Sequence, residues 1–232
     1  MNKKKVFSWT LYDWANSAFA TTVMAGFFPI FFEKYWSNPE LVDQSTFYLG
    51  VSNSVGSLIV AMMAPFLGAI SDTGSTKKKF LFTFAFLGIL ATSLLWIVEQ
   101  GDWQLAATLY AIGAIGFASA NVFYDSLLPS VAKKSEFDFV SSLGYSMGYL
   151  GGGVLFVINI LMYQNPQWFG IPDATTAIRL SFVSVAVWWA IFSIPIFLFV
   201  PEPKNNENVD FFRAVSLGWT QLKSTFKEIR KM

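Results

Sequence analysis

The sequence predicts an all-α polytopic membrane protein with six transmembrane helices, and the distribution of charge is the main reason. Of its 232 residues, 54% are hydrophobic and only 13% are charged, whereas about a quarter of a soluble domain is charged. Six stretches contain no Asp, Glu, Lys or Arg: residues 14–32, 44–71, 80–98, 103–124, 139–172 and 180–201. A bilayer core about 30 Å thick needs roughly 20 apolar helical residues. Each stretch is therefore long enough to cross the membrane once.

The amino-terminal region begins the first of these helices. Lys3, Lys4 and Lys5 precede an apolar run, as in a signal peptide, but the run continues past Phe32 and ends in Glu33-Lys34. This length predicts a retained first span. We expect one transmembrane bundle over residues 1–200, with spans at residues 12–34, 46–70, 79–98, 103–128, 140–163 and 178–200.

The carboxy-terminal residues 201–232 differ from the rest of the chain. Pro201-Glu-Pro203 is a helix breaker that begins a linker. An apolar stripe at helical spacing follows it, formed by Phe212, Val215, Trp219, Leu222, Phe226 and Ile229. Because the remaining charge of this segment is dominated by basic residues, we expect a cytoplasmic amphipathic helix on the membrane surface. A coiled-coil seam is the alternative interpretation.

Basic residues in alternate connections predict the orientation of the bundle. One side of the predicted membrane holds 14 of the 16 lysines and arginines, and the other side holds only Lys34 and Arg179. Lysine and arginine accumulate in cytoplasmic loops. We therefore expect both termini to be cytoplasmic.

The composition excludes several kinds of chemistry. Without histidine, the chain has no His-based catalytic triad and no imidazole metal ligand. Without cysteine, it has no disulfide and no thiol nucleophile. The formal charge of +1 gives no basis for nucleic-acid binding. We expect no cofactor, no metal site and no catalytic residues.

The connection between the second and third spans carries a recognisable motif. It reads Gly68-x-x-x-Asp72-x-Gly74, followed by Lys77 and Lys78. This pattern resembles the cytoplasmic loop signature of the major facilitator superfamily, although Thr73 and Ser75-Thr76 stand where that family has basic residues. Asp72 ends a helix, where the helix dipole disfavours an anion. It should therefore have a compensating partner; the alternative is an ordinary solvated loop acid.

A narrower resemblance rests on three segments. They are Leu11-Tyr-Asp13-Trp-Ala-Asn16 in the first span, Phe123-Tyr-Asp125-Ser-Leu-Leu-Pro129 closing the fourth, and Gly144-Tyr-Ser-Met-Gly148-Tyr-Leu-Gly151 in the fifth. They resemble the branch containing the autophagy-related vacuolar amino-acid effluxer and its bacterial relatives. The resemblance covers essentially all 232 residues but only the amino-terminal half of a twelve-span member. It implies a first bundle of two three-helix repeats.

Four polar residues are the candidate coupling or gating site. Asp13 and Asn16 lie three apart on the first span, and Asn121 and Asp125 lie four apart on the fourth. Because these spans run in opposite directions, both pairs should lie in the cytoplasmic third of the bundle. Ionisable groups at membrane depth usually face a cavity or a partner. The alternative is that both acids simply reach the membrane interface, where the helix dipole favours Asp13.

Small residues on two spans predict close helix packing. On the fifth span they are Gly144, Gly148, Gly151 and Gly152, and on the second they are Gly50, Ser54, Ser57, Ala61 and Pro65. The resemblance implies that these two helices pack against the second half of the transporter. We therefore expect both stripes to lack their partner in this chain.

The functional expectation follows from the resemblance. It implies a secondary active transporter that moves a small polar solute by alternating access, with amino-acid efflux and proton coupling as the expected activity. The expected partners are membrane lipid, the solute, protons and the missing C-terminal six-helix half, in a bacterial cytoplasmic (inner) membrane. The alternatives are a self-assembling six-span half-transporter, a membrane enzyme and a non-transport membrane subunit.

Overall fold

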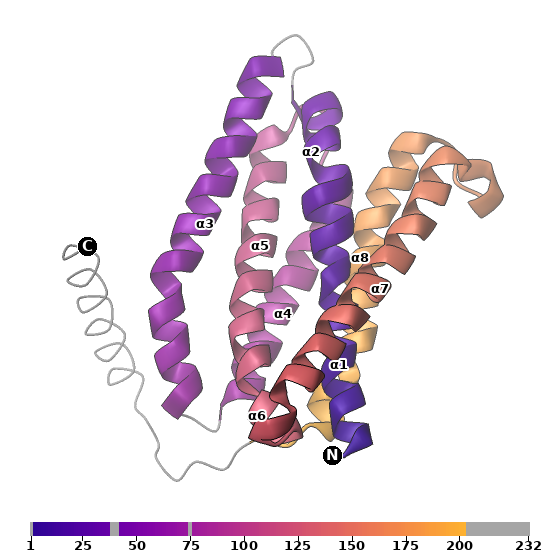
Figure 1. Cartoon of the computed structure of the whole chain (residues 1–232). Coiled ribbons are helices and arrows are strands. Elements are labelled where there is room, and N and C mark those ends of the chain that lie inside the picture. The colour runs from indigo at the N-terminus through magenta and orange to yellow at the C-terminus, as the bar shows by residue number, and fades with distance from the viewer. Residues whose placement is uncertain (1, 38–41, 74–75, 203–232) are drawn as a thin grey trace.

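A computed structural model describes residues 2–37, 42–73 and 76–202 (Figure 1). Within these ranges all regular structure is helical, and six segments are long and apolar enough to cross a membrane. This confirms the predicted fold class. The amphipathic helix expected within residues 201–232 lies almost wholly outside the described residues.

The first membrane segment is longer than predicted, because it begins at Lys3 rather than at residue 12. It runs through α1 (Lys3–Ala18), a π-helical stretch (Phe19–Phe27), α2 (Phe28–Phe31) and a second π-helical stretch (Phe32–Trp36). The Asn2 side chain caps its start by accepting a hydrogen bond from the Lys5 backbone at 3.3 Å. π-Helical turns often occur at functional sites.

The remaining segments alternate with short connections. They are α3 (Val42–Thr73), α4 (Lys77–Leu94) with a 3-10 turn (Leu95–Ile97), α5 (Trp103–Ser126), α6 (Leu128–Val131), a 3-10 turn (Lys134–Glu136), α7 (Phe137–Gln164), a 3-10 turn (Pro166–Phe169) and α8 (Ala174–Phe199). Gly101 and Gly170 have positive φ values of 90° and 69° in the connections before α5 and α8. Glycine adopts this conformation without steric cost, which permits both tight turns.

Aromatic side chains fill the interior between the helices. α1 packs against α7 and α8, α4 packs against α5 and α8, and α3 lies along α5 (Figure 1). Trp36, Phe28 and Phe182 are fully buried, and the ring centroids of Trp36 and Phe182 lie 5.7 Å apart. Phe28 also stacks on Tyr110 with a centroid distance of 4.1 Å. Because lipid is as apolar as these side chains, close packing is what holds the helices together.

Both ends of the described chain lie on the same side of the bundle. The Lys4 ammonium lies 3.7 Å from the centroid of the Phe199 ring, near the end of α8. An even number of membrane crossings requires this arrangement. That this side is the cytoplasmic one stays a prediction from the distribution of basic residues.

Candidate functional site

A small polar cavity opens beside the middle of α1. Its volume is about 100 Å³. The lining residues come from α1, α5 and α7, and they are Trp9, Asp13, Asn121, Tyr124, Asp125, Ser141 and Tyr145. We call it the acidic cavity. Three of the four residues predicted as the coupling site therefore meet at one place.

The two carboxylates of the acidic cavity come from facing helices. Asp13 is partly buried on α1, and Asp125 is exposed in the last turn of α5. Both carboxylates line this one cavity. The Tyr124 hydroxyl also lies close to Asp13: an atom placed at the Cβ position of Gly144 would stand 3.1 Å from that hydroxyl and 3.2 Å from Asp13 Oδ2. Two like charges share a confined space here, an arrangement that favours binding of a positive charge.

Aromatic packing fixes the wall of the acidic cavity. The rings of Trp9 and Tyr124 stack with centroids 4.3 Å apart and planes 14° apart. Trp9 Nε1 also donates a hydrogen bond to the Tyr124 carbonyl oxygen at 3.1 Å. Both residues are buried, with exposed fractions of 2% and 3%. The Asp125 backbone is therefore held next to a rigid contact between α1 and α5.

Asn16 does not line the acidic cavity but supports it. Its Nδ2 donates a hydrogen bond to Asn121 Oδ1 at 2.5 Å, and Asn16 is 1% exposed. Buried amides in apolar surroundings need such partners. Asn16 therefore joins α1 to α5 behind the cavity, which is a positioning role rather than contact with a ligand.

The glycines of α7 pack against α1. A Cβ atom added at Gly148 would lie 2.6 Å from Ser17 Oγ, and one at Gly152 would lie 2.8 Å from Thr21 Oγ1. A Cβ at Gly144 would meet the Trp9 ring at 2.9 Å, and one at Gly151 would clash with the Trp14 carbonyl oxygen. The expectation that this stripe lacks a partner is wrong. Small residues allow the α1 and α7 backbones to approach within the bundle itself.

The glycines of α3 behave differently. A Cβ atom at Gly50, Gly56 or Gly68 would have no neighbour within 4 Å. Several large apolar side chains of α3 are exposed as well, such as Leu58 and Met62 at 61% and 59%. α3 is thus the loosely packed helix of the described bundle.

The lysines of the loop signature bind the carboxyl ends of neighbouring helices. Lys77 Nζ donates to the Ser126 carbonyl oxygen at 3.0 Å, at the end of α5. Lys78 Nζ donates to the carbonyl oxygens of Phe197 and Val200 at 2.6 and 2.8 Å, at the end of α8. Cations stabilise helix carboxyl termini, where unpaired carbonyls carry partial negative charge. Gly74 and the side chain of Asp72 lie outside the described residues, so the expected partner of Asp72 stays a prediction.

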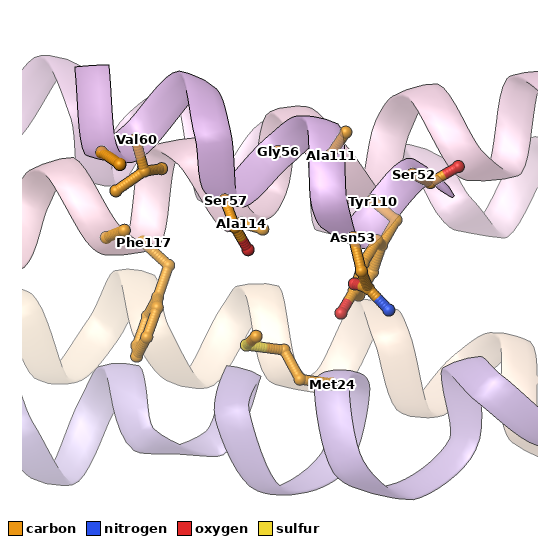
Figure 2. A pocket seen from close by; sticks show the side chains of 12 residues that line it. Met24, Ser52, Asn53, Gly56, Ser57, Val60, Tyr110, Ala111, Ala114 and Phe117 are labelled. Atoms are coloured by element: carbon orange, nitrogen blue, oxygen red, sulfur yellow. The ribbon is translucent and has the colours of Figure 1, made fainter. Parts of the chain in front are cut away.

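A second, larger cavity lies between α3, α5 and the first membrane segment. Its volume is about 320 Å³, and Figure 2 shows the side chains around it. Asn53 and Ser57 extend from α3 toward Met24 on the facing helix. The other lining residues are Ser52, Gly56, Val60, Ala61, Tyr110, Ala111, Ala114, Phe117 and Ala118. We call it the central cavity; it has polar groups on α3 and Tyr110, and no charged side chain lines it.

Sequence reasoning missed the central cavity. Ser57 and Ala61 were expected only as packing residues, and Asn53, Tyr110 and Met24 were not singled out. Asn53 could have indicated the central cavity, because it is an amide within a stretch of 28 residues (44–71) that contains no charged side chain. A strongly polar side chain at that depth usually faces a cavity or another helix.

Both cavities lie among helices that are long and apolar enough to cross a membrane, so the chain is an integral membrane protein. The family model described as "Vacuole effluxer Atg22 like" matches residues 40–232. The chain belongs to this family. The match covers most of the sequence and includes α3, α5 and α7.

One of the curated relatives carries a transporter name. The chain is 38% identical over 195 residues to the "Uncharacterized MFS-type transporter YxiO" of Bacillus subtilis, covering 83% of this chain and 46% of that protein. It is 21% identical over 267 residues to "Autophagy-related protein 22" of Eremothecium gossypii, covering 94% of this chain and 52% of that protein. An "Uncharacterized protein" of Aquifex aeolicus is 28% identical over 167 residues, with 72% and 41% coverage. The chain thus spans about half the length of these relatives. No solved structure matches it.

Proposed function

We propose that this bundle is the amino-terminal half of a secondary active transporter that moves a small polar solute by alternating access. The observation that carries the proposal is the acidic cavity, where Asp13 of α1 and Asp125 of α5 line one space. Carboxylates at membrane depth are costly and are typical of ion or proton pathways. Asp13 and Asp125 would couple solute movement to protons, and Asn121 and Asn16 would hold the two helices in register.

The central cavity is our candidate for the solute site within this half. Its volume of about 320 Å³ is within the range of roughly 300–1,000 Å³ typical of ligand pockets. Asn53, Ser57 and Tyr110 supply polar groups among mostly apolar neighbours. We take efflux as the direction to test, since the family model that matches the chain describes a vacuole effluxer. We take amino acids as the solute class to test, because the sequence motifs resemble the branch that contains the vacuolar amino-acid effluxer.

Alternating access needs two bundles that move against each other around a shared site. The chain spans about half the length of its relatives. The missing partner would be a C-terminal six-helix half. Its contact surface would include α3, whose apolar side chains are exposed. A homodimer of two such halves is the second arrangement, because a second copy could cover the same helix.

We place both termini in the cytoplasm on the basis of the 14 basic residues on one side. We place the protein in a bacterial cytoplasmic membrane because two of its relatives are bacterial. The sequence contains no cysteine, so single introduced cysteines give clean labelling. Cysteines at Gly101 and Asn165 should react with an impermeant reagent outside intact cells, and one at Ser75 should not. Labelling at Ser75 from outside would reverse the orientation.

The transport proposal is tested in liposomes. The longer protein that carries this bundle should take up an amino-acid mixture under a proton gradient. The 232-residue chain should insert without transporting. Saturable uptake by this chain alone would favour the homodimer, and no uptake by either protein would contradict the transport proposal for these solutes.

A further inference from the structure

We propose that the acidic cavity binds one small monovalent metal cation, with Na⁺ as the probe. The binding claim stands on the geometry of the cavity. A role for the cation in coupling would rest on the proposed transport function. The cation would sit between the Asp13 and Asp125 carboxylates, beside the Tyr124 hydroxyl.

The cavity supplies the ligand chemistry that such a cation needs. Hard cations prefer oxygen ligands, including carboxylates, carbonyls and water. The residues lining the cavity carry carboxylate oxygens on Asp13 and Asp125 and hydroxyls on Tyr124 and Ser141. In liquid a water molecule occupies about 30 Å³, so a cavity of about 100 Å³ has room for an ion and one or two waters.

A buried hydroxyl provides an independent indication of a ligand. Tyr124 is only 3% exposed, and its hydroxyl makes no hydrogen bond of normal geometry. It faces the Asp13 carboxylate inside the cavity. A missing water or ion is one explanation for a buried polar atom without a partner, and this atom, unlike most of the others, lies beside a carboxylate. A cation bound by Asp13 would bring this hydroxyl oxygen into its coordination shell.

The electrostatics around the cavity also favour a positive charge. Asp125, a second anion, lines the same cavity as Asp13. Tyr124 and Asp125 lie in the last turn of α5, which ends at Ser126, so the negative end of the helix dipole points at this region. Lys77 lies at this end of α5 and donates to the Ser126 carbonyl oxygen. The two carboxylates are left to share an external cation.

Binding of radioactive Na⁺ to the purified chain in detergent tests the proposal directly. The wild-type protein should bind about one Na⁺ per chain in a saturable manner. Excess Li⁺ should displace it, whereas a bulky organic cation should not fit the cavity. Asp13→Asn and Asp125→Asn should each weaken binding by roughly tenfold or more, which corresponds to about 1.4 kcal/mol. Tyr124→Phe should weaken it by a smaller factor.

The matched control is Glu99→Gln, which removes one negative charge from an exposed residue outside the cavity. It should bind Na⁺ as the wild type does, and circular dichroism should show unchanged helicity in all variants. Absence of saturable Na⁺ binding to the folded wild type would overturn the proposal, as would unchanged binding in Asp125→Asn. Na⁺ binding without any solute transport would support this inference and count against the proposed function. Proton-driven transport without Na⁺ binding would support the proposed function and contradict this inference.

Discussion

Two adjacent glycines of α7 allow a test of how closely it packs on α1. Gly152→Ala places a methyl group 2.8 Å from Thr21 Oγ1 and 2.9 Å from the Ser17 carbonyl oxygen. Gly153→Ala places the same group where nothing lies within 4 Å. Both changes gain about 1 kcal/mol of helix propensity. This gain cancels when the two variants are compared.

The difference between the two variants therefore isolates the steric contact. Overpacking a tight interface costs roughly 1–3 kcal/mol, and the Ser17 carbonyl belongs to the α1 backbone, which cannot rotate away. Gly152→Ala should be less stable than Gly153→Ala by about that amount. Unfolding of both proteins in mixed detergent, followed by circular dichroism, measures the difference. Equal stability, or a less stable Gly153→Ala, would refute the close α1–α7 packing.

Three further predictions follow from single contacts. Alanine substitutions at Asn16 and Asn121 should be non-additive by about 1 kcal/mol in a double-mutant cycle of unfolding; additive effects would argue against their hydrogen bond. Lys78→Met should lower the free energy of unfolding by roughly 0.3–1 kcal/mol, because the end of α8 loses its cation; unchanged stability would contradict this. A hydrogen bond from the Thr176 backbone N–H holds the pKa of the Asp173 carboxyl below its ordinary value of 3.8. The Asp173 cap therefore stabilises α8 at pH values above 3.8, and this stabilisation is lost as the pH falls through the lowered pKa. The melting temperature of Asp173→Asn should not show this loss at acid pH. If the melting temperature of the variant depended on pH as that of the wild type does, the cap would be contradicted.

The membrane helices could be predicted from the sequence because charge is excluded from the bilayer core. The residues at which these helices begin and end could not be predicted, because a helix continues into water wherever local groups bind its terminal N–H groups. The Asn2 cap lets α1 begin at Lys3, within a basic segment that hydropathy assigns to the outside of the span. The bounds of the bundle within residues 1–200 and the tail helix beyond it stay predictions.

The candidate site was partly predictable for a similar reason. Helical spacing shows that Asn121 and Asp125 share a face of α5, and the opposite directions of the two spans place Asp13 at the same end. Spacing cannot show which face of one helix meets another. The hydrogen bond between Asn16 and Asn121, which are 105 residues apart, and the packing of Gly152 on α1 appear only in three dimensions.

The central claim is that the carboxylates of Asp13 on α1 and Asp125 on α5 couple transport to protons. The most direct measurement is solute-driven proton movement in liposomes that contain a pH-sensitive dye and the longer protein carrying this bundle. Wild type and Glu99→Gln should move protons when amino acid is added. Asp125→Asn should bind and exchange the amino acid but move no protons. Proton movement by Asp125→Asn equal to that of the wild type, across the pH range, would contradict the account.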